Sequence, residues 1–207
     1  METLFNQLCD KFPDFEESLN VFSEKEKLII LEKIKNLKDE TKFTSTLAEL
    51  DFGRLFIKLG FDIEYDKPYN KQTPDWTISI GDSIAICEVY RFSNSYIEKP
   101  ISDKRFRLLN VKLHKIIQYE WLTKPNNLTE KISKYNEIIL QTKCPYFIAI
   151  ALDFASGFGL DDIKEHFLGR GVEFDCKEDS EHEPSIFYEN PQLSGIIVLD
   201  NKKFYLL

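Results

Sequence analysis

Two apolar runs, TPDWTISI (73–80) and SIAICEVYRF (83–92), are separated by the dipeptide Gly81-Asp82. A glycine followed by a polar residue is typical of a tight hairpin turn, because glycine adopts positive φ without steric cost. Both runs have the length and the β-branched content of strands. The pattern therefore predicts a β-hairpin in this part of the chain.

The predicted turn also predicts which residues face each other. If it closes a two-residue hairpin, Ile80 faces Ser83, and the same register places Asp75 opposite Glu88. Directly opposed residues share one face of a sheet, with Cβ atoms roughly 4.5–5.5 Å apart. A slip of one residue would instead put the two carboxylates on opposite faces.

Helical spacing of apolar residues predicts two helices before this hairpin. Ser23 and Glu26 form the pattern of a capping box, which predicts a helix that runs to about Leu37. Its expected apolar positions are Leu28, Leu31, Ile34 and Leu37.

A second helix is expected to start at Thr44 or Ser45 and to stop before Gly60, with Glu49 at the edge of its apolar stripe. A carboxylate in that position is partly desolvated unless it has a partner. A snorkelling, solvated Glu49 is the simpler alternative. The stripe itself consists of Ala48, Phe52, Leu55, Phe56 and Leu59.

The rest of the chain predicts further strands and helices. Residues 61–65 are expected to form a strand, followed by the hairpin, a basic helix over about 103–122 and another helix over about 128–142. The continuous apolar run CPYFIAIALDF (144–154) is typical of a strand that is buried on both faces. GIIVLD and KFYLL predict a C-terminal hairpin.

This order of elements predicts an α/β fold in which helices flank a mixed central sheet. We expect residues 1–40 to form an N-terminal helical extension or interaction arm, and residues 41–207 to form one compact domain. The length of 207 residues and the hydrophobic content of 43% are sufficient for one well-filled core.

Charge and composition narrow the class of protein. The formal net charge of −8 argues against indiscriminate binding of nucleic acid. The N-terminus lacks the basic and apolar regions of a secretory signal, and no apolar run approaches the ~20 residues of a membrane-spanning helix. The four cysteines show no CxxC spacing, as expected of reduced, buried thiols. These features predict a cytoplasmic protein without a membrane partner.

The charges are unevenly distributed along the chain. Residues 99–115 carry six basic side chains against one acidic, whereas residues 173–189 carry seven acidic against one basic. A local basic face beside an acidic remainder suits an anionic substrate, although charge runs are also common on solvated surfaces. The residues that we expect to contact nucleic acid are Lys104, Arg105, Arg107, Lys112 and Lys115.

The facing carboxylates point to metal chemistry. Like charges directly opposite each other on a sheet destabilise it unless a cation lies between them. Carboxylates and water suit Mg²⁺ or Mn²⁺ better than zinc, and the three histidines and four cysteines show no zinc spacing.

The order of these residues resembles the PD-(D/E)XK, or restriction-endonuclease-like, nuclease superfamily. The match consists of a helical Glu49, then Pro74-Asp75, then Glu88 in Glu88-Val89-Tyr90. It covers about residues 44–155 and includes the run EKISKY followed by PYFIAIAL. The resemblance implies metal-dependent cleavage of DNA phosphodiester bonds, with Mg²⁺ or Mn²⁺ held by Asp75 and Glu88 and assisted by Glu49.

The sequence departs from the superfamily at Tyr90, where the pattern has a lysine. A phenol with a pKa of about 10 is a poor base at neutral pH, and Arg91 alternates to the other face of the strand. Three interpretations stay open: the lysine has moved, to Lys131 or Lys134 and less favourably to Lys115; Tyr90 orients water beside the metal; or the fold binds without cutting.

The expected partners follow from these alternatives. A nuclease would bind nucleic acid, most naturally DNA, and members of this superfamily often form homodimers to cut both strands. A non-catalytic relative would bind nucleic acid or protein. A protein partner would dock through residues 1–40 or through the acidic segment 173–189.

Overall fold

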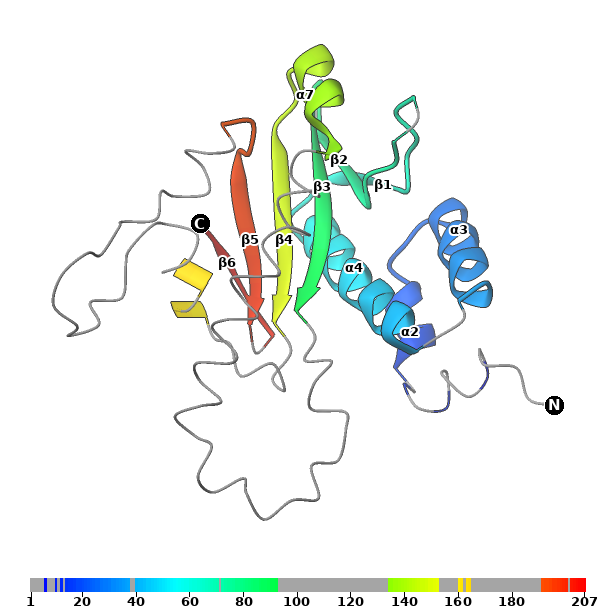
Figure 1. Ribbon diagram of the computed structural model, residues 1–207. Helices are drawn as coiled ribbons and strands as arrows, with labels where there is room; N and C mark the ends of the chain where they lie inside the picture. Colours follow the sequence, from blue (N-terminus) through cyan, green and yellow to red (C-terminus); the bar gives the residue numbers. More distant parts are fainter. Residues whose placement is uncertain are drawn as a thin grey trace, which may run out of the picture.

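A computed structural model describes residues 14–37, 40–70, 72–92, 134–152, 191–200 and 202–207, together with residues 6, 10, 12, 160, 161, 163 and 164. Its centre is a six-stranded sheet in the order β1-β2-β3-β4-β5-β6 (Figure 1). The strands are β1 (Asp62–Tyr65), β2 (Trp76–Ile80), β3 (Ser83–Phe92), β4 (Tyr146–Leu152), β5 (Gly195–Asp200) and β6 (Lys203–Leu206).

The sheet is mixed, as the sequence predicts. Strand β4 runs parallel to β3 and β5, whereas all other neighbouring pairs are antiparallel. The buried β4 lies between its two parallel partners, which confirms the interpretation of its continuous apolar run. The C-terminal hairpin β5–β6 is also confirmed. The α/β class with a mixed central sheet is therefore correct.

The register of the β2–β3 hairpin is the predicted one. Ile80 pairs with Ser83 and Trp76 pairs with Cys87, while Gly81 adopts a φ of 55° in the turn. A residue with a side chain rarely adopts such a φ, whereas glycine does so without steric cost and therefore permits the tight turn. The turn thus fixes the position of every residue along both strands.

Four helices accompany the sheet in the described residues: α2 (Phe15–Leu19), α3 (Glu24–Lys35), α4 (Glu40–Lys58) and α7 (Asn136–Thr142). The Ser23 side chain accepts a hydrogen bond from the Glu26 backbone N–H at 3.3 Å, as the capping box predicts. Helix α4 begins earlier than expected, at Glu40, because Phe43 is fully buried in the core and extends the helix by a turn.

The helices cover opposite faces of the sheet. Helices α2, α3 and α4 share a core with Trp76, Cys87 and Val89, whereas α7 packs on the other face with Ile86 and Ile148. This division follows the alternation of side chains along β3. Figure 1 shows α3 and α4 beside the β1–β3 half of the sheet and α7 at the end where β4 begins.

Two expected core positions are wrong. Leu28 of α3 is 68% exposed and Leu59, just after α4, is 59% exposed. Helix α3 buries the expected Ile34 together with Ile30, which was not expected, because its packing against β1 turns the face that contains Leu28 to solvent. Gly60, at a φ of 86°, reverses the chain immediately after Leu59.

Residues before position 40 share the core of the rest of the molecule. Phe15, Phe22, Ile30 and Ile34 are buried in the same cluster as residues of α4 and β2. A domain boundary at residue 40 stays a prediction. Among the helices of the described residues, none is long and apolar enough to cross a membrane.

Candidate functional site

Asp75 and Glu88 lie on one face of the sheet. Asp75 directly precedes β2, and the register continued by one residue places it beside Glu88. The backbone N–H of Val89 donates a hydrogen bond to Asp75 Oδ2 at 2.8 Å. The next residues along the two strands, Trp76 and Cys87, face the α4 side, so by alternation both carboxylates face the α7 side. The predicted register is confirmed as far as the Trp76–Cys87 pair, and the role of the two carboxylates stays a prediction.

Glu88 is buried and is held by the start of the α7 segment. Its side chain is about 4% exposed, and Oε2 accepts a hydrogen bond from the Tyr135 hydroxyl at 2.7 Å. Lys134 Nζ lies 3.7 Å from Oε1. Burial raises the pKa of Tyr135, and the charges of Glu88 and Asp75 raise it further. Tyr135 therefore stays protonated and donates to the carboxylate.

Glu49 is neutralised by a lysine from another helix. Lys33 of α3 places Nζ 2.9 Å from Glu49 Oε2, and the hydroxyl of Tyr65 donates to the same oxygen. Lys33 Nζ also donates to the Tyr65 oxygen at 2.6 Å and lies 3.4 Å from Asp66 Oδ2. The Glu49 side chain is 12% exposed. The partner that a desolvated Glu49 requires is therefore Lys33.

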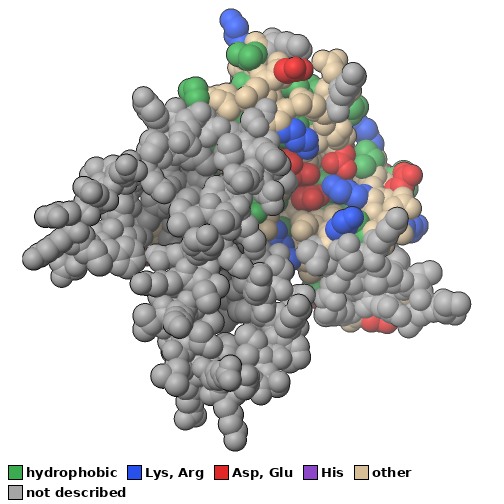
Figure 2. Space-filling view, in the orientation of Figure 1, with side chains coloured by type: hydrophobic (Ala, Val, Ile, Leu, Met, Phe, Trp, Pro, Cys, Tyr) green, Lys and Arg blue, Asp and Glu red, His purple; other side chains and the backbone are tan. Residues whose placement is uncertain are grey.

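The charges around Lys33 keep it protonated. Burial acts to lower the pKa of Lys33, but the carboxylates of Glu49, Asp75 and Asp66 outweigh burial and raise the pKa above its ordinary value. On the described part of the face in Figure 2, acidic and basic side chains lie close together. The four carboxylates (Glu49, Asp66, Asp75 and Glu88) with Lys33 and Lys134 are called the carboxylate cluster below.

Asp66 joins the cluster through the turn after β1. It has a φ of 48°, and its backbone N–H donates to the carbonyl of Asp75 at 3.1 Å. Burial raises the pKa of Asp66, whereas Lys33 lowers it and Glu49 and Glu88 raise it. This balance shows that the carboxylates from α4, the turn and β3 lie within electrostatic reach of one another.

Trp76 supports the cluster from beneath. Its indole N–H donates to the Glu49 carbonyl at 2.8 Å, which ties α4 to β2 next to Asp75. The ring packs against Tyr65 with centroids 4.7 Å apart. Gly53 allows this approach, because a Cβ there would lie 2.3 Å from Trp76 Cζ2. Packing of the apolar core thus positions the acidic side chains.

Tyr90 lies on the face of Glu88, two residues along β3, and packs at the margin of the α7-side core. Arg91 points to the other face, where its Nη1 donates to Thr44 Oγ1 at 2.6 Å. The predicted geometry of both residues is confirmed, while a role for Tyr90 in orienting water stays a prediction. Lys131, the expected nucleic-acid contacts from Lys104 to Lys115 and the acidic segment 173–189 lie outside the described residues.

Sequence reasoning missed Lys33, Tyr65, Asp66 and the bond from Tyr135 to Glu88. The sequence of α3 contained one hint of a charged partner for the core edge. Lys33 lies between Ile30 and Ile34, which are buried, so its side chain starts close to the core. Tyr135 is fully buried, just before α7. Its hydroxyl needs a partner at that depth.

The donor set suits a hard cation held by two protein carboxylates. Within the described part of the chain, no group of three or more His, Cys, Asp or Glu is arranged to hold a metal ion. Mg²⁺ is commonly bound by one or two carboxylates together with waters and substrate phosphates. A carboxylate offers about four lone-pair sites, so Asp75 and Glu88 can keep their hydrogen bonds and also bind an ion. The residues therefore fit Mg²⁺ or Mn²⁺ in a two-carboxylate site.

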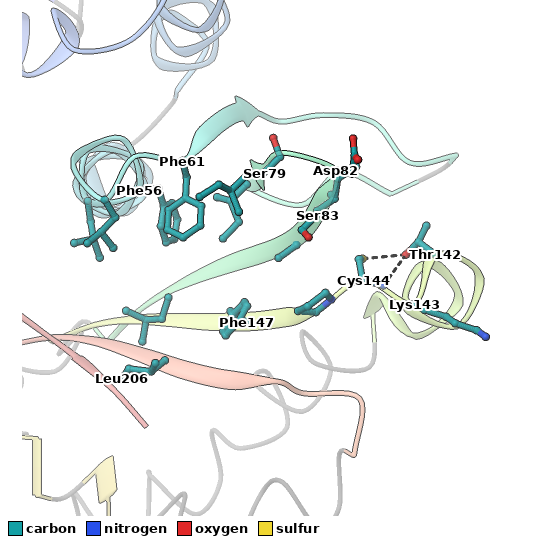
Figure 3. Close-up of a pocket in the computed structure, with 18 of the residues that line it drawn as sticks. Phe56, Phe61, Ser79, Asp82, Ser83, Thr142, Lys143, Cys144, Phe147 and Leu206 are labelled. Carbon is teal, nitrogen blue, oxygen red and sulfur yellow. Dashed lines mark hydrogen bonds between the residues drawn. The ribbon is translucent and has the colours of Figure 1, made fainter.

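An apolar pocket lies elsewhere on the sheet. It has a volume of about 930 Å³ and contains none of the carboxylate cluster. Figure 3 shows Phe56, Phe61 and Phe147 around it, with Ser83 near one end. Its charged lining residues, Asp82 and Lys143, come from turns. We take the carboxylate cluster as the candidate site because several partly or fully buried titratable groups converge there within the described residues.

Comparison with known proteins adds little about function. No family model and no curated protein matches the sequence. Among solved structures, the chain is similar to one described as a CdiA-CT/CdiI toxin and immunity complex from Burkholderia pseudomallei, with 14% identity and a TM-score of 0.42. The match covers 83% of this chain and 90% of that chain. A likeness at this level carries no conclusion about activity.

Proposed function

We propose that the chain is a metal-dependent nuclease of the PD-(D/E)XK type that cleaves DNA phosphodiester bonds. The observation that supports this proposal best is the placement of Asp75 and Glu88 side by side, one accepting from a backbone N–H and the other buried against Tyr135. Structural side chains seldom place two carboxylates together in this way, because the repulsion destabilises the fold.

Three residues of the cluster and two of their hydrogen-bond partners have a proposed role in cleavage. Asp75 and Glu88 hold Mg²⁺ or Mn²⁺, which supplies an activated water and stabilises charge on the phosphate when bound. The Val89 N–H orients the Asp75 carboxylate, and Tyr135 orients that of Glu88. Lys134, 44% exposed and 3.7 Å from Glu88, is placed to attract the phosphate and to substitute for the lysine that Tyr90 replaces.

The basic residues from Lys104 to Lys115 are proposed to contact the DNA backbone. Neutralisation of phosphates releases counterions, so affinity for DNA should fall steeply as salt rises. The proposal for these residues rests on their sequence alone.

A second function is favoured by the neutralisation of the cluster. Glu49 is paired with Lys33, and Glu88 lies beside both Tyr135 and Lys134. A fold whose carboxylates are satisfied by its own side chains, with Tyr90 in place of lysine, can bind nucleic acid or a protein partner without cutting it.

An assay of supercoiled plasmid cleavage in the presence of Mg²⁺ or Mn²⁺ distinguishes the two proposed functions. We expect the native protein to cut and Asp75→Asn and Glu88→Gln to lose at least about 100-fold in rate, because both variants keep a hydrogen-bond acceptor but lose the charge. Asp82→Asn, in the exposed β2–β3 turn, is the matched control and should cut normally. Cleavage that persists in both site variants, or none by the native protein with either ion, would reject the nuclease.

A further inference from the structure

Lys33 is surrounded by oxygen atoms from separate elements. Its Nζ lies 2.9 Å from Glu49 of α4, 2.6 Å from the hydroxyl of Tyr65 in β1 and 3.4 Å from Asp66 in the following turn. An ammonium group has three N–H donors, and these three oxygens match that number. The lysine side chain is 30% exposed, so its charge lies within the cluster and not in bulk water.

The position of this ammonium corresponds to a cation site. Asp75 also acts on Lys33, since its charge helps to raise the lysine pKa. Small cations are bound by several oxygens that converge from different elements, and here the converging group is tethered to α3. Because the charge of Glu49 is compensated by Lys33, the carboxylates left for a mobile ion are Asp75 and Glu88.

We propose that Lys33 acts as a built-in cation that occupies the Glu49–Asp66 side of the cluster, so that the native protein binds one divalent ion and not two. The inference rests on the proposed function for the location of that one ion, at Asp75 and Glu88.

The physical basis is mutual exclusion. A divalent ion at Glu49 and Asp66 would meet the positive charge of Lys33 at close range, and the lysine would have to leave its three acceptors. Replacing Lys33 with methionine keeps an unbranched side chain of similar length and removes the charge. The carboxylates of Glu49, Asp66 and Asp75 then attract a mobile cation to the vacated position.

The test counts Mn²⁺ ions bound per full-length chain, from the electron paramagnetic resonance signal of free Mn²⁺ during titration. We expect one ion for the native protein, two for Lys33→Met and one for Lys33→Arg, which restores the positive charge. Lys25→Met is the matched control on the same helix, since within the described residues Lys25 pairs with Glu64, whose side chain is 41% exposed, and it should bind one ion. A second ion in the native protein, or no gain in Lys33→Met, overturns the inference.

The outcomes keep this inference apart from the proposed function. If the native protein binds no Mn²⁺ but Lys33→Met gains one ion, the metal-dependent nuclease fails and the built-in cation stands. If both bind one ion and the native protein cuts DNA, the nuclease stands and the role of Lys33 is rejected. Should Lys33→Met fail to fold by circular dichroism, Lys33→Gln, which keeps a hydrogen-bond donor, takes its place with the same expected gain.

Discussion

The carboxylate cluster and the apolar pocket are two very different regions built on one sheet. The cluster gathers charged side chains from α3, α4, β3 and the turn after β1. Each of the ion pairs described above brings a lysine ammonium close to a carboxylate. The pocket, of about 930 Å³, is lined mainly by apolar side chains such as Phe56, Ile78 and Phe147. The pocket therefore offers mainly apolar contacts, whereas the cluster offers charged groups.

The comparison of the two regions shows that the cluster contains buried charges that a stable fold does not need. The apolar pocket is lined in part by the C-terminal end of α4, and its lining residues Leu59, Ile80 and Leu206 are exposed to water. Glu88 and Glu49, in contrast, are desolvated at a cost in free energy unless partners compensate them. Two lysines and two tyrosines do so. Such an arrangement is characteristic of functional sites.

The largest expected effect is on the support beneath the cluster. Gly53→Ala would place a Cβ 2.3 Å from the Trp76 ring and 2.9 Å from that of Phe22, so we expect a loss of about 3 kcal/mol in the free energy of unfolding. Gly60→Ala, between two pocket-lining residues, meets no atom within 4 Å and should cost roughly 1 kcal/mol through its φ of 86°. Urea unfolding measures both, and equal losses would show that the site is not the more tightly packed region.

A smaller effect is expected for the charges of the cluster. Lys33→Met leaves Glu49 and Asp66 without their cation, and we expect a loss of about 2 kcal/mol, less than for a fully buried pair because Lys33 is partly exposed. Lys25→Met breaks only an exposed pair with Glu64 and should cost less than about 0.5 kcal/mol. Urea unfolding in the absence of divalent ions compares them. Equal stabilities would mean that the cluster is no more desolvated than ordinary surface.

The smallest effect is expected at the pocket. Ile80→Thr shortens a side chain that is 57% exposed at the end of β2, and the stability should change by no more than about 0.5 kcal/mol. Plasmid cleavage should be unchanged, because the residue lies outside the carboxylate cluster. A large drop in cleavage with intact stability would place the functional site at the pocket.

Local features of the chain predicted the sheet well. The dipeptide Gly81-Asp82 determines the β2–β3 register, and that register alone predicted that Asp75 and Glu88 are neighbours. The apolar run of β4 and the final hairpin were equally clear, since each depends on a few adjacent residues. Patterns of this kind report local structure directly.

Tertiary packing determined what the sequence did not predict. Leu28 fits a helical stripe but is exposed, because the contact of α3 with β1 selects another face of the helix. The same rotation carries Lys33 to Glu49 and Asp66. No spacing rule links a lysine in one helix to a carboxylate 16 residues later in the next. The pairing of Lys33 with Glu49 and Asp66 can therefore be recognised only once the positions of the helices are known.

The two halves of the cluster differ in how far apart their residues lie along the chain. The Lys33–Glu49 and Tyr65–Glu49 contacts each span 16 residues, whereas Tyr135 reaches Glu88 across 47 and Thr73 across 62. Closing a longer loop costs more conformational entropy and takes more of the chain. On the ribosome, the first half can assemble while the residues that complete the second are still untranslated. A polypeptide interrupted before position 134 would thus carry Glu88 without its bond to Tyr135, and the carboxylate cluster could not be completed until synthesis had passed that point.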